Sequence, residues 1–278
     1  MKAKIWFITG ASRGFGLEIT KAAIANGDKV VATVRSQPEK LIREISSENL
    51  HVVRLDVTQE DQAKSALRQA VDHFGHIDIL INNAGFGLLG AIEEASDNEV
   101  RQSFDTNVFG LLNVTRAALP YFRSQRSGHI INISSVVGLT SPSGWGLYAA
   151  TKFAVEGITE ALAAEVKPLG IHVTAIEPGF FRTNFLDGSS LKAAEAVIED
   201  YSSTSGQMRA FASQINYKQP GDPVKLAAAI MNLVDAEQPP VHLPLGNDTL
   251  LYFNQKMEKF NREIQDWHSV ITSTDHNV

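Results

Sequence analysis

The stretch "KIWFITGASRGFGLEITKAAIANG", residues 4–27, gives the first indication of the fold. Residues 4–9 form a continuous apolar run, which is typical of a strand buried on both faces of a parallel sheet. Residues 15–27 have the pattern of a helix that ends at Gly27. A glycine-rich turn joins the two, so the chain is predicted to begin with a strand, a tight turn and a helix.

This turn, "TGASRGFG" (9–16), has glycines at positions 10, 14 and 16. Glycine lets the backbone turn tightly and approach a ligand closely. The free N–H groups at a helix N-terminus attract a pyrophosphate. The turn therefore suggests a dinucleotide site, although a strand–helix turn that binds nothing could need the same glycines.

Strand-like and helical patterns alternate along the rest of the chain. Further strands are predicted at 29–34, 51–57, 77–81, 129–134, 171–177 and 241–245, and helices at 59–75, 97–123, 147–166 and 223–235. This alternation predicts an α/β protein with a doubly wound parallel sheet, the Rossmann fold. No linker or repeat divides the sequence, so residues 1–278 are predicted to form a single domain.

Residues 180–220 break the alternation. The segment places large side chains such as Phe180, Tyr201 and Phe211 among glycines and serines. An insertion of this length in a compact domain is usually a functional lid or a disordered segment. We predict a helical substrate lid near 180–220.

The composition argues against several kinds of protein. The net charge is −6 with no basic tract, which does not suit nucleic-acid binding, and there is no cysteine for a disulfide, a thiol nucleophile or a zinc site. The apolar runs at 4–9 and 225–234 are too short for a signal-peptide core or a membrane span. We expect a soluble, cytoplasmic protein with no membrane or nucleic-acid partner. No metal is predicted, because no third ligand accompanies His73 and His76.

The end of the second strand bears on the choice of cofactor. An acidic residue that binds the ribose of NAD(H) is expected about 20 residues beyond the glycine motif. Val34 occupies that place and Arg35 follows it. An arginine can pair with the 2′-phosphate of NADP(H), and Arg13 could add a second cation. This predicts NADP(H), unless both arginines are only solvated surface residues.

Tyr148 and Lys152 lie four residues apart in the predicted helix 147–166 and therefore on the same face. Alone, the pair could be a packed phenol beside a lysine that reaches solvent. Ser135, however, follows strand 129–134, and open α/β sheets bind ligands at the C-terminal ends of their strands. Asn107 lies within the predicted helix 97–123, where a buried amide needs hydrogen-bond partners.

Six motifs follow one another along the chain: "TGASRGFG" (9–16), "NNAG" (82–85), "TNVFG" (106–110), "INISS" (131–135), "YAATK" (148–152) and "EPGFFRT" (177–183). In this order and at this spacing they resemble the short-chain dehydrogenase/reductase family over about residues 4–184. The stretch "VVATVR" (30–35) and the Phe-rich segment look most like the branch of NADPH-dependent carbonyl reductases and enzymes similar to 17β-hydroxysteroid and retinol dehydrogenases. The resemblance implies an oxidoreductase acting on CH–OH or C=O groups, as a homodimer or homotetramer.

The resemblance also implies roles for individual residues. Tyr148 would be the general acid in ketone reduction and the base in alcohol oxidation, and Ser135 would hold the substrate oxygen. Lys152 would bind the nicotinamide ribose and lower the pKa of Tyr148, while Asn107 would hold a water that links Lys152 to solvent. The cofactor half would span about 1–145 and the catalytic and substrate half about 146–278. Besides Tyr148 and Lys152, the cofactor would contact Gly10, Ser12, Arg13, Gly14, Phe15, Gly16, Arg35, Asp56, Val57, Asn83, Ala84, Gly85, Pro178, Gly179, Phe181 and Thr183.

Carbonyl reduction requires a tyrosine, a cation and a serine for the following reasons. A free tyrosine has a pKa near 10, poorly matched to acid–base work at neutral pH. A nearby cation stabilises the phenolate and lowers that pKa. A serine adds a donor to the oxygen on which charge develops.

Large apolar side chains flank the predicted catalytic residues in sequence: Phe86, Leu88, Leu89, Trp145, Phe180, Phe185 and Leu186. If they line one pocket, it favours an apolar ketone or aldehyde, although several could simply close the core. We predict hydride transfer from NADPH to such a carbonyl. The alternatives are an NAD-dependent alcohol or hydroxysteroid dehydrogenase and a catalytically silent NADP-binding sensor.

Overall fold

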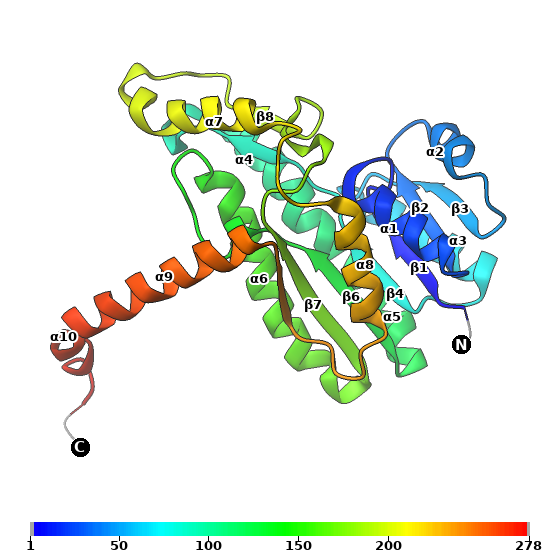
Figure 1. The fold of residues 1–278 in the computed structure, drawn as a ribbon. Helices are drawn as coiled ribbons and strands as arrows, with labels where there is room; N and C mark the ends of the chain where they lie inside the picture. Colours follow the sequence, from blue (N-terminus) through cyan, green and yellow to red (C-terminus); the bar gives the residue numbers. More distant parts are fainter. Residues whose placement is uncertain (1–2, 277–278) are drawn as a thin grey trace.

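A seven-stranded parallel sheet forms the centre of the molecule in the computed structural model, which describes residues 3–276 (Figure 1). The strands lie in the order β3-β2-β1-β4-β6-β7-β9. They are β1 (Ile5–Ile8), β2 (Lys29–Val34), β3 (Leu50–Arg54), β4 (Ile79–Asn82), β6 (Gly128–Ile133), β7 (Ile171–Pro178) and β9 (His242–Leu245). The order runs one way from β1 to β3 and the other way from β4 to β9. The predicted doubly wound fold is therefore confirmed, and its switch point lies between β1 and β4.

Helices cover both faces of this sheet (Figure 1). One layer contains α1 (Gly14–Ala25), α2 (Pro38–Ile45) and α8 (Pro223–Val234). The other contains α3 (Glu60–Phe74), α5 (Leu111–Gln125) and α6 (Gly146–Val166). Helix α2 was not predicted from the sequence. Half of its eight residues are charged and Leu41 is its one buried side chain, so the helix has little apolar pattern.

The alternation of side chains in β1 explains the two layers. Trp6 and Ile8 are buried in the core under α1 and α8, whereas Phe7 is buried in the core under α3 and α5. Because both faces are covered, the strand is apolar throughout, as the run 4–9 predicted. The core around Trp6 also contains Ile176 and Leu226, so distant parts of the sequence share it and form a single domain.

The predicted helix 97–123 is not continuous. The chain forms α4 (Asp97–Phe104), then a π-helical segment (Asp105–Gly110), and only then α5. Periodicity does not distinguish this arrangement from one long helix, because all three parts follow each other without a turn. A π-helical segment inside α-helices is frequently found at a functional site, and this one contains Asn107.

Residues 180–220 form a segment above one end of the sheet, which we call the lid segment (Figure 1). It contains the predicted helical structure in α7 (Gln207–Ile215) and also a short strand, β8 (Leu191–Ala193), that pairs with β5 (Gly87–Leu89). Its two ends meet where Phe181 forms a bridge with Gly221. The lid segment is thus anchored at its base and tied to the body through β5.

The chain continues after β9 into α9 (Asn247–Asp266) and α10 (His268–Thr272), which point away from the body (Figure 1). Neither helix was predicted from the sequence. Exposed apolar side chains line them: Leu250, Leu251, Tyr252, Met257, Phe260, Ile264, Trp267, Val270 and Ile271. Within residues 3–276, no helix has the length and apolar character that a membrane span requires.

Candidate active site

The glycine turn has the geometry of a nucleotide cradle. Gly10 and Gly14 adopt positive φ angles of 66° and 56°, which favour glycine. A Cβ on Gly16 would lie 2.5 Å from the Gly10 carbonyl oxygen and 2.6 Å from Asn83 Nδ2. The glycines therefore bring the N-terminus of α1 and the end of β4 together, and the resulting space suits a pyrophosphate.

A cavity of about 660 Å³ opens from this turn along the carboxyl ends of the strands. Of the residues predicted to bind cofactor or substrate or to act in catalysis, it is lined by Gly10, Ser12, Arg13, Gly14, Phe15, Arg35, Asp56, Val57, Asn83, Ala84, Gly85, Phe86, Ser135, Trp145, Tyr148, Lys152, Pro178, Gly179, Phe180, Phe181, Thr183, Phe185 and Leu186. Gly16 and Asn107 are not among the lining residues and support the wall. One continuous cavity thus joins the glycine turn to the Tyr–Lys pair.

The end of β2 has an arginine and no acidic residue that could bind a ribose hydroxyl. Val34 is buried in the sheet and Arg35 is exposed at the cavity rim. The neighbouring Arg54 donates through Nε to the Arg35 carbonyl oxygen at 3.1 Å. Arg13 instead turns its guanidinium to the lid segment, where it donates to Ser189 O at 2.6 Å and to Ser190 Oγ at 3.2 Å. Arg35 is therefore better placed than Arg13 to meet a phosphate beyond β2.

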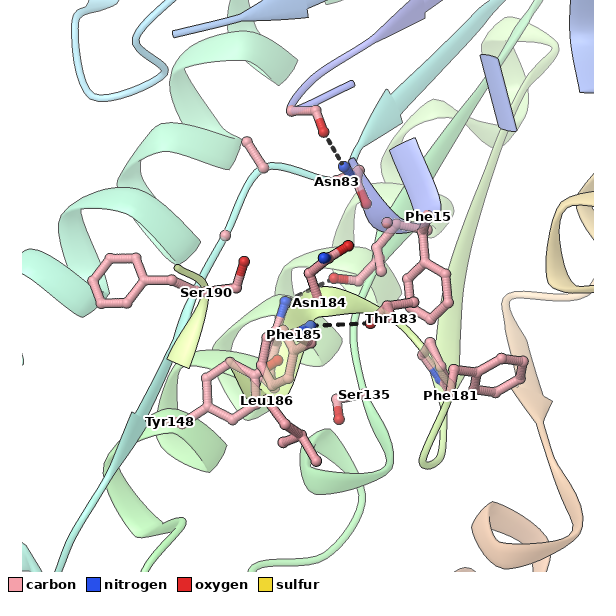
Figure 2. Close-up of a pocket in the computed structure, with 18 of the residues that line it drawn as sticks. Phe15, Asn83, Ser135, Tyr148, Phe181, Thr183, Asn184, Phe185, Leu186 and Ser190 are labelled. Carbon is pink, nitrogen blue, oxygen red and sulfur yellow. Dashed lines mark hydrogen bonds between the residues drawn. The ribbon is translucent and has the colours of Figure 1, made fainter. Parts of the chain in front are cut away.

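Tyr148, Ser135 and Lys152 meet at the other end of the cavity. Figure 2 shows Tyr148 and Ser135 around the same space, with Phe185 and Leu186 beside them. Lys152 Nζ donates to the Ile133 carbonyl oxygen at 2.8 Å and lies 5.6 Å from the centre of the Tyr148 ring. The helical spacing of the pair and the end of β6 thus bring the predicted catalytic groups together.

Burial shifts the pKa values of Tyr148 and Lys152. It raises the pKa of Tyr148 above the ordinary tyrosine value, and the facing Ser135 hydroxyl opposes the rise only in part. Burial also lowers the pKa of Lys152 to about 8, against the opposing charge of Glu156. The pKa of Tyr148 is thus raised and not lowered as expected, because burial disfavours the phenolate.

Asn107 joins the π-helical segment to the cavity wall. Its Oδ1 accepts from the Phe86 N–H at 3.0 Å, and its Nδ2 donates to Phe86 O at 2.9 Å and to Thr151 Oγ1 at 3.1 Å. A Cβ on Gly85 would lie 2.9 Å from that Oδ1, so this glycine permits the close approach. Both amide hydrogens are donated to protein atoms, and the side chain fixes the main chain at Phe86.

Aromatic side chains contact Tyr148 and line the adjoining part of the cavity. The Tyr148 ring lies 5.8 Å from Trp145 and 5.6 Å from Phe185, centre to centre. Phe180 contacts Phe211 of α7 edge to face, with ring centres 5.8 Å apart. The predicted apolar pocket is therefore built partly by the lid segment.

Two of the apolar residues that flank the site in sequence do not line the cavity. Leu88 and Leu89 are 1% and 3% exposed, respectively. They lie in β5, which pairs with β8, and Leu89 packs behind Tyr148 and Trp145. They close the core, which was the alternative left open for this set.

Several lining residues were not predicted from the sequence, among them Ser134, Val137, Asn184, Ser189, Ser190, Lys192, Met208, Gln219 and Tyr252. Most belong to the lid segment, whose aromatic and Met content was the available signal. Tyr252 comes from α9, and no local pattern indicates that this residue returns to the cavity.

The chain matches the family model of the short chain dehydrogenases over residues 4–194. It is 36% identical over 270 residues to oxidoreductase BOA17 of Botryotinia fuckeliana, covering 96% of this chain and 97% of that protein. It is 39% identical over 250 residues to a 3-ketodihydrosphingosine reductase of Bacteroides thetaiotaomicron, covering 88% of this chain and 89% of that protein.

Solved structures agree with this match. A short-chain dehydrogenase from Streptomyces avermitilis has a TM-score of 0.91 at 38% identity, covering 99% of this chain and 100% of that one. ElxO with NADP bound has a TM-score of 0.74 at 28% identity, with coverage of 89% and 99%. The 3-ketoacyl-(acyl-carrier-protein) reductase of Brucella melitensis complexed with NADH also has 0.74, at 26% identity with coverage of 87% and 96%. The strand order, the glycine cradle and the match over most of its length show that this chain belongs to the short-chain dehydrogenase family of oxidoreductases.

Proposed function

We propose that this protein reduces an apolar ketone or aldehyde with NADPH and that Tyr148 is the general acid. The observation that carries the proposal is the meeting of Tyr148, Ser135 and Lys152 in one cavity with the glycine turn. An acid, a hydrogen-bond donor and a cation at one point are what carbonyl reduction requires. The reverse reaction, alcohol oxidation, would use the same groups.

The cofactor would lie between the glycine turn and Lys152, with its phosphates at Gly10, Ser12, Gly14 and Gly16. The nicotinamide supplies the hydride when bound. Arg35 supports NADP(H) over NAD(H), because a cation at the end of β2 pairs with a 2′-phosphate while Val34 offers no acceptor to a ribose hydroxyl.

Tyr148 would give its proton to the substrate oxygen. Its raised pKa supports this direction, because the phenol stays protonated at neutral pH and is available as an acid. Ser135 would donate to the same oxygen, and its own Oγ is oriented by accepting from the Val137 N–H at 3.2 Å. Lys152, held by the Ile133 carbonyl, would stabilise the phenolate that forms.

Asn107 is assigned a supporting role. Both of its amide hydrogens are donated to Phe86 and Thr151. The amide therefore has no hydrogen left for the water expected between Lys152 and solvent, and that water would have to donate to an acceptor nearby. The same contacts hold Gly85 and Phe86 at the cavity, where the resemblance assigns the adenosine ribose and the substrate.

The substrate is proposed to be an apolar carbonyl compound. Trp145, Phe180, Phe185 and Leu186 line the part of the cavity near Tyr148 and carry no charge. The name of the Bacteroides relative, a 3-ketodihydrosphingosine reductase, adds a long-chain ketone to the candidates. The lid segment would close over this apolar end.

Cofactor contacts are assigned mainly to residues 1–145, and catalysis and substrate binding mainly to residues 146–278. A homodimer or homotetramer is also proposed, because Phe109 in the π-helical segment and Phe153 in α6 are 54% and 41% exposed. Both side chains are large, apolar and exposed, which suits an interface between subunits.

The test is the loss of the reduced-nicotinamide absorbance when purified protein is mixed with aryl ketones, keto esters, steroid ketones and 3-ketodihydrosphingosine. NADPH and NADH are compared in parallel. We expect faster turnover with NADPH, and we expect Tyr148→Phe to lower kcat by about 100-fold or more while NADPH still binds. Tyr121→Phe, a change in α5 outside the cavity lining, serves as the matched control. Unchanged turnover in Tyr148→Phe would refute the assignment, and NADPH binding without any turnover would favour the sensor alternative.

A further inference from the structure

A second cluster of chemical groups lies behind the cavity. Glu156 comes from α6, Glu177 from β7 and His242 from β9. His242 Nδ1 lies 3.0 Å from Glu177 Oε1 and 3.3 Å from Glu156 Oε2. One ligand atom of each residue lies within 4.8 Å of the other two. None of the three lines the cavity of the candidate active site.

The sheet brings these residues together. In the parallel pairing of β7 with β9, Ala175 lies opposite His242 and Glu177 opposite Pro244. Helix α6 packs on β7, and Glu156 is one helical turn beyond Lys152. The cluster therefore lies at the junction of α6 with the edge of the sheet, next to the proposed catalytic helix but outside its cavity.

Two carboxylate oxygens in the cluster have no hydrogen-bond partner among the described residues. They are Glu156 Oε2 and Glu177 Oε2. The Glu177 side chain is fully buried and that of Glu156 is 8% exposed. Buried polar atoms almost always have a partner, and a buried charge without one is costly. Glu156 Oε2 lies 3.3 Å from His242 Nδ1, and Glu177 Oε2 belongs to the carboxylate whose Oε1 lies 3.0 Å from it. A cation bound beside Nδ1 would therefore supply a partner to both carboxylates.

The outer contacts of the three residues fit a metal site. Ser134 Oγ donates to Glu156 Oε1, and the Leu243 N–H bonds to Glu177. Glu160 Oε1 lies 3.5 Å from His242 Nε2. A metal-binding histidine usually donates its other ring N–H to a carboxylate, which fixes the ring and its tautomer. Here Glu160 would hold the proton on Nε2 and leave Nδ1 free for a metal.

We propose that Glu156, Glu177 and His242 bind a divalent transition-metal ion, with Zn²⁺ as the reference ion. Zinc bonds to nitrogen and oxygen are about 2.0–2.2 Å long, so tetrahedral ligands lie about 3.3 Å apart. The distances of 3.0 and 3.3 Å from Nδ1 to the two carboxylates are close to that spacing, and all three ligand atoms lie within 4.8 Å of one another. An imidazole ligand favours such ions over Mg²⁺ and Ca²⁺, which take oxygen ligands.

The proposed ion has a structural role. It would link α6 to β7 and to the edge strand β9, and His242, whose side chain is 40% exposed, leaves the fourth position open to solvent. This site was not predicted from the sequence, because its ligands are far apart in the chain. Their spacing matches no metal motif, and only the pairing of β7 with β9 unites them.

The experiment uses the full chain after removal of metals with a chelator. Titration calorimetry with Zn²⁺ alone is expected to give one site per chain, and Mg²⁺ is expected to give no comparable binding. The midpoint of thermal unfolding is expected to rise with Zn²⁺, because an ion that binds only the folded chain stabilises it. Neither readout depends on substrate or cofactor, so this test is independent of the proposed reductase activity.

Substitutions of the proposed ligands test which residues bind the ion. His242→Ala is expected to weaken Zn²⁺ binding by more than about 100-fold, and Glu160→Gln by about 10- to 100-fold. His268→Ala removes an exposed imidazole on α10 and is expected to bind like the wild type. If Glu177→Gln does not fold, His242→Ala decides the question, since its side chain is partly exposed. Absence of a one-to-one Zn²⁺ site in the wild type, or equal binding by His242→Ala, would overturn the proposal. The cluster would then be two carboxyls bridged by a histidine.

Discussion

Two opposing effects act on the pKa of Tyr148. The spacing to Lys152 predicts a tyrosine with a lowered pKa, whereas burial beside Trp145 and Phe185 raises it. Desolvation is the larger effect because the ring is buried, while Lys152 Nζ lies 5.6 Å from the ring centre and donates to the Ile133 carbonyl oxygen. The chain by itself therefore holds an acid and not a phenolate, which suits reduction.

Arg35 is the residue that we expect to select the cofactor. Arg35→Ala should raise the KM for NADPH by about 10- to 100-fold, because charge-assisted hydrogen bonds to a phosphate contribute about 1.5–3 kcal/mol. The KM for NADH should stay the same. Steady-state kinetics with both cofactors measure the change, and Arg43→Ala on α2 is the matched control. An equal rise in KM for NADPH and NADH would show that Arg35 does not bind the 2′-phosphate.

His129 gives a prediction on pH and stability. Burial lowers its pKa to about 3, with a smaller contribution from His172. Thr174 Oγ1 donates to Pro240 O at 2.6 Å, so it accepts from His129 Nε2 at 2.9 Å, and the ring is neutral. Below the unfolded pKa of about 6.5 the unfolded chain binds a proton that the folded chain does not, so the free energy of unfolding falls as the pH decreases.

The substitution His129→Gln keeps a donor toward Thr174 and removes the titration. Between about pH 7 and about pH 5, the variant should lose about 2 kcal/mol less unfolding free energy than the wild type. Urea unfolding at the two pH values measures this difference. His268→Gln, an exposed change, should follow the wild type. Parallel losses in His129→Gln and the wild type would contradict a neutral buried ring.

At the scale of elements, the turn between β1 and α1 depends on a close approach of main chain. Gly16→Ala would place a methyl group 2.5 Å from the Gly10 carbonyl and 2.6 Å from Asn83 Nδ2. Since backbone must move, we expect a loss of about 1–3 kcal/mol in stability and weaker NADPH binding.

Gly157→Ala is the matched control for that change. Gly157 lies in α6, and a Cβ there meets nothing within 4 Å, so alanine should be neutral or stabilise the helix by up to about 1 kcal/mol. Fluorescence titration with NADPH and thermal unfolding separate the two variants. If Gly16→Ala binds NADPH like the wild type, the cradle is looser than its geometry indicates.

The elements differ in how far the sequence predicts them. The buried strands and α1, α6 and α8 were predicted, because long apolar patterns reflect burial directly. Helix α3 was predicted at 59–75 and begins one residue later, with Gln59 as its N-cap, while Thr58 Oγ1 donates to Asp56 Oδ1 at 2.8 Å. Helix α9 was missed because its apolar residues are exposed and no core fixes their pattern.

At the scale of the whole molecule, we expect self-association through the helices that carry Phe109 and Phe153. Light scattering should give a mass of two or four times the chain mass of 30.3 kDa. A double change to aspartate at these positions should lower that mass, because charge opposes burial at an interface. Val197→Asp, an exposed position in the lid segment, is the matched control. A wild-type mass equal to one chain would refute the expectation.

The sequence by itself determined the doubly wound sheet, the glycine turn and the identity of the family, since each depends on local patterns and on the order of those patterns along the chain. It also identified most residues that line the cavity, because parallel strands end at the same edge and carry their motifs there. For Ser135, Tyr148 and Lys152, a strand end and one helical face were sufficient.

Only the tertiary structure decided how distant residues meet. It turned Arg13 toward Ser189, brought Tyr252 of α9 to the cavity and joined Glu156, Glu177 and His242 through the pairing of β7 with β9. It also buried Tyr148, and this burial raises the pKa of the phenol. Local patterns report the propensity and spacing of neighbours, whereas burial and long-range contact depend on which elements pack together, and desolvation follows from that packing.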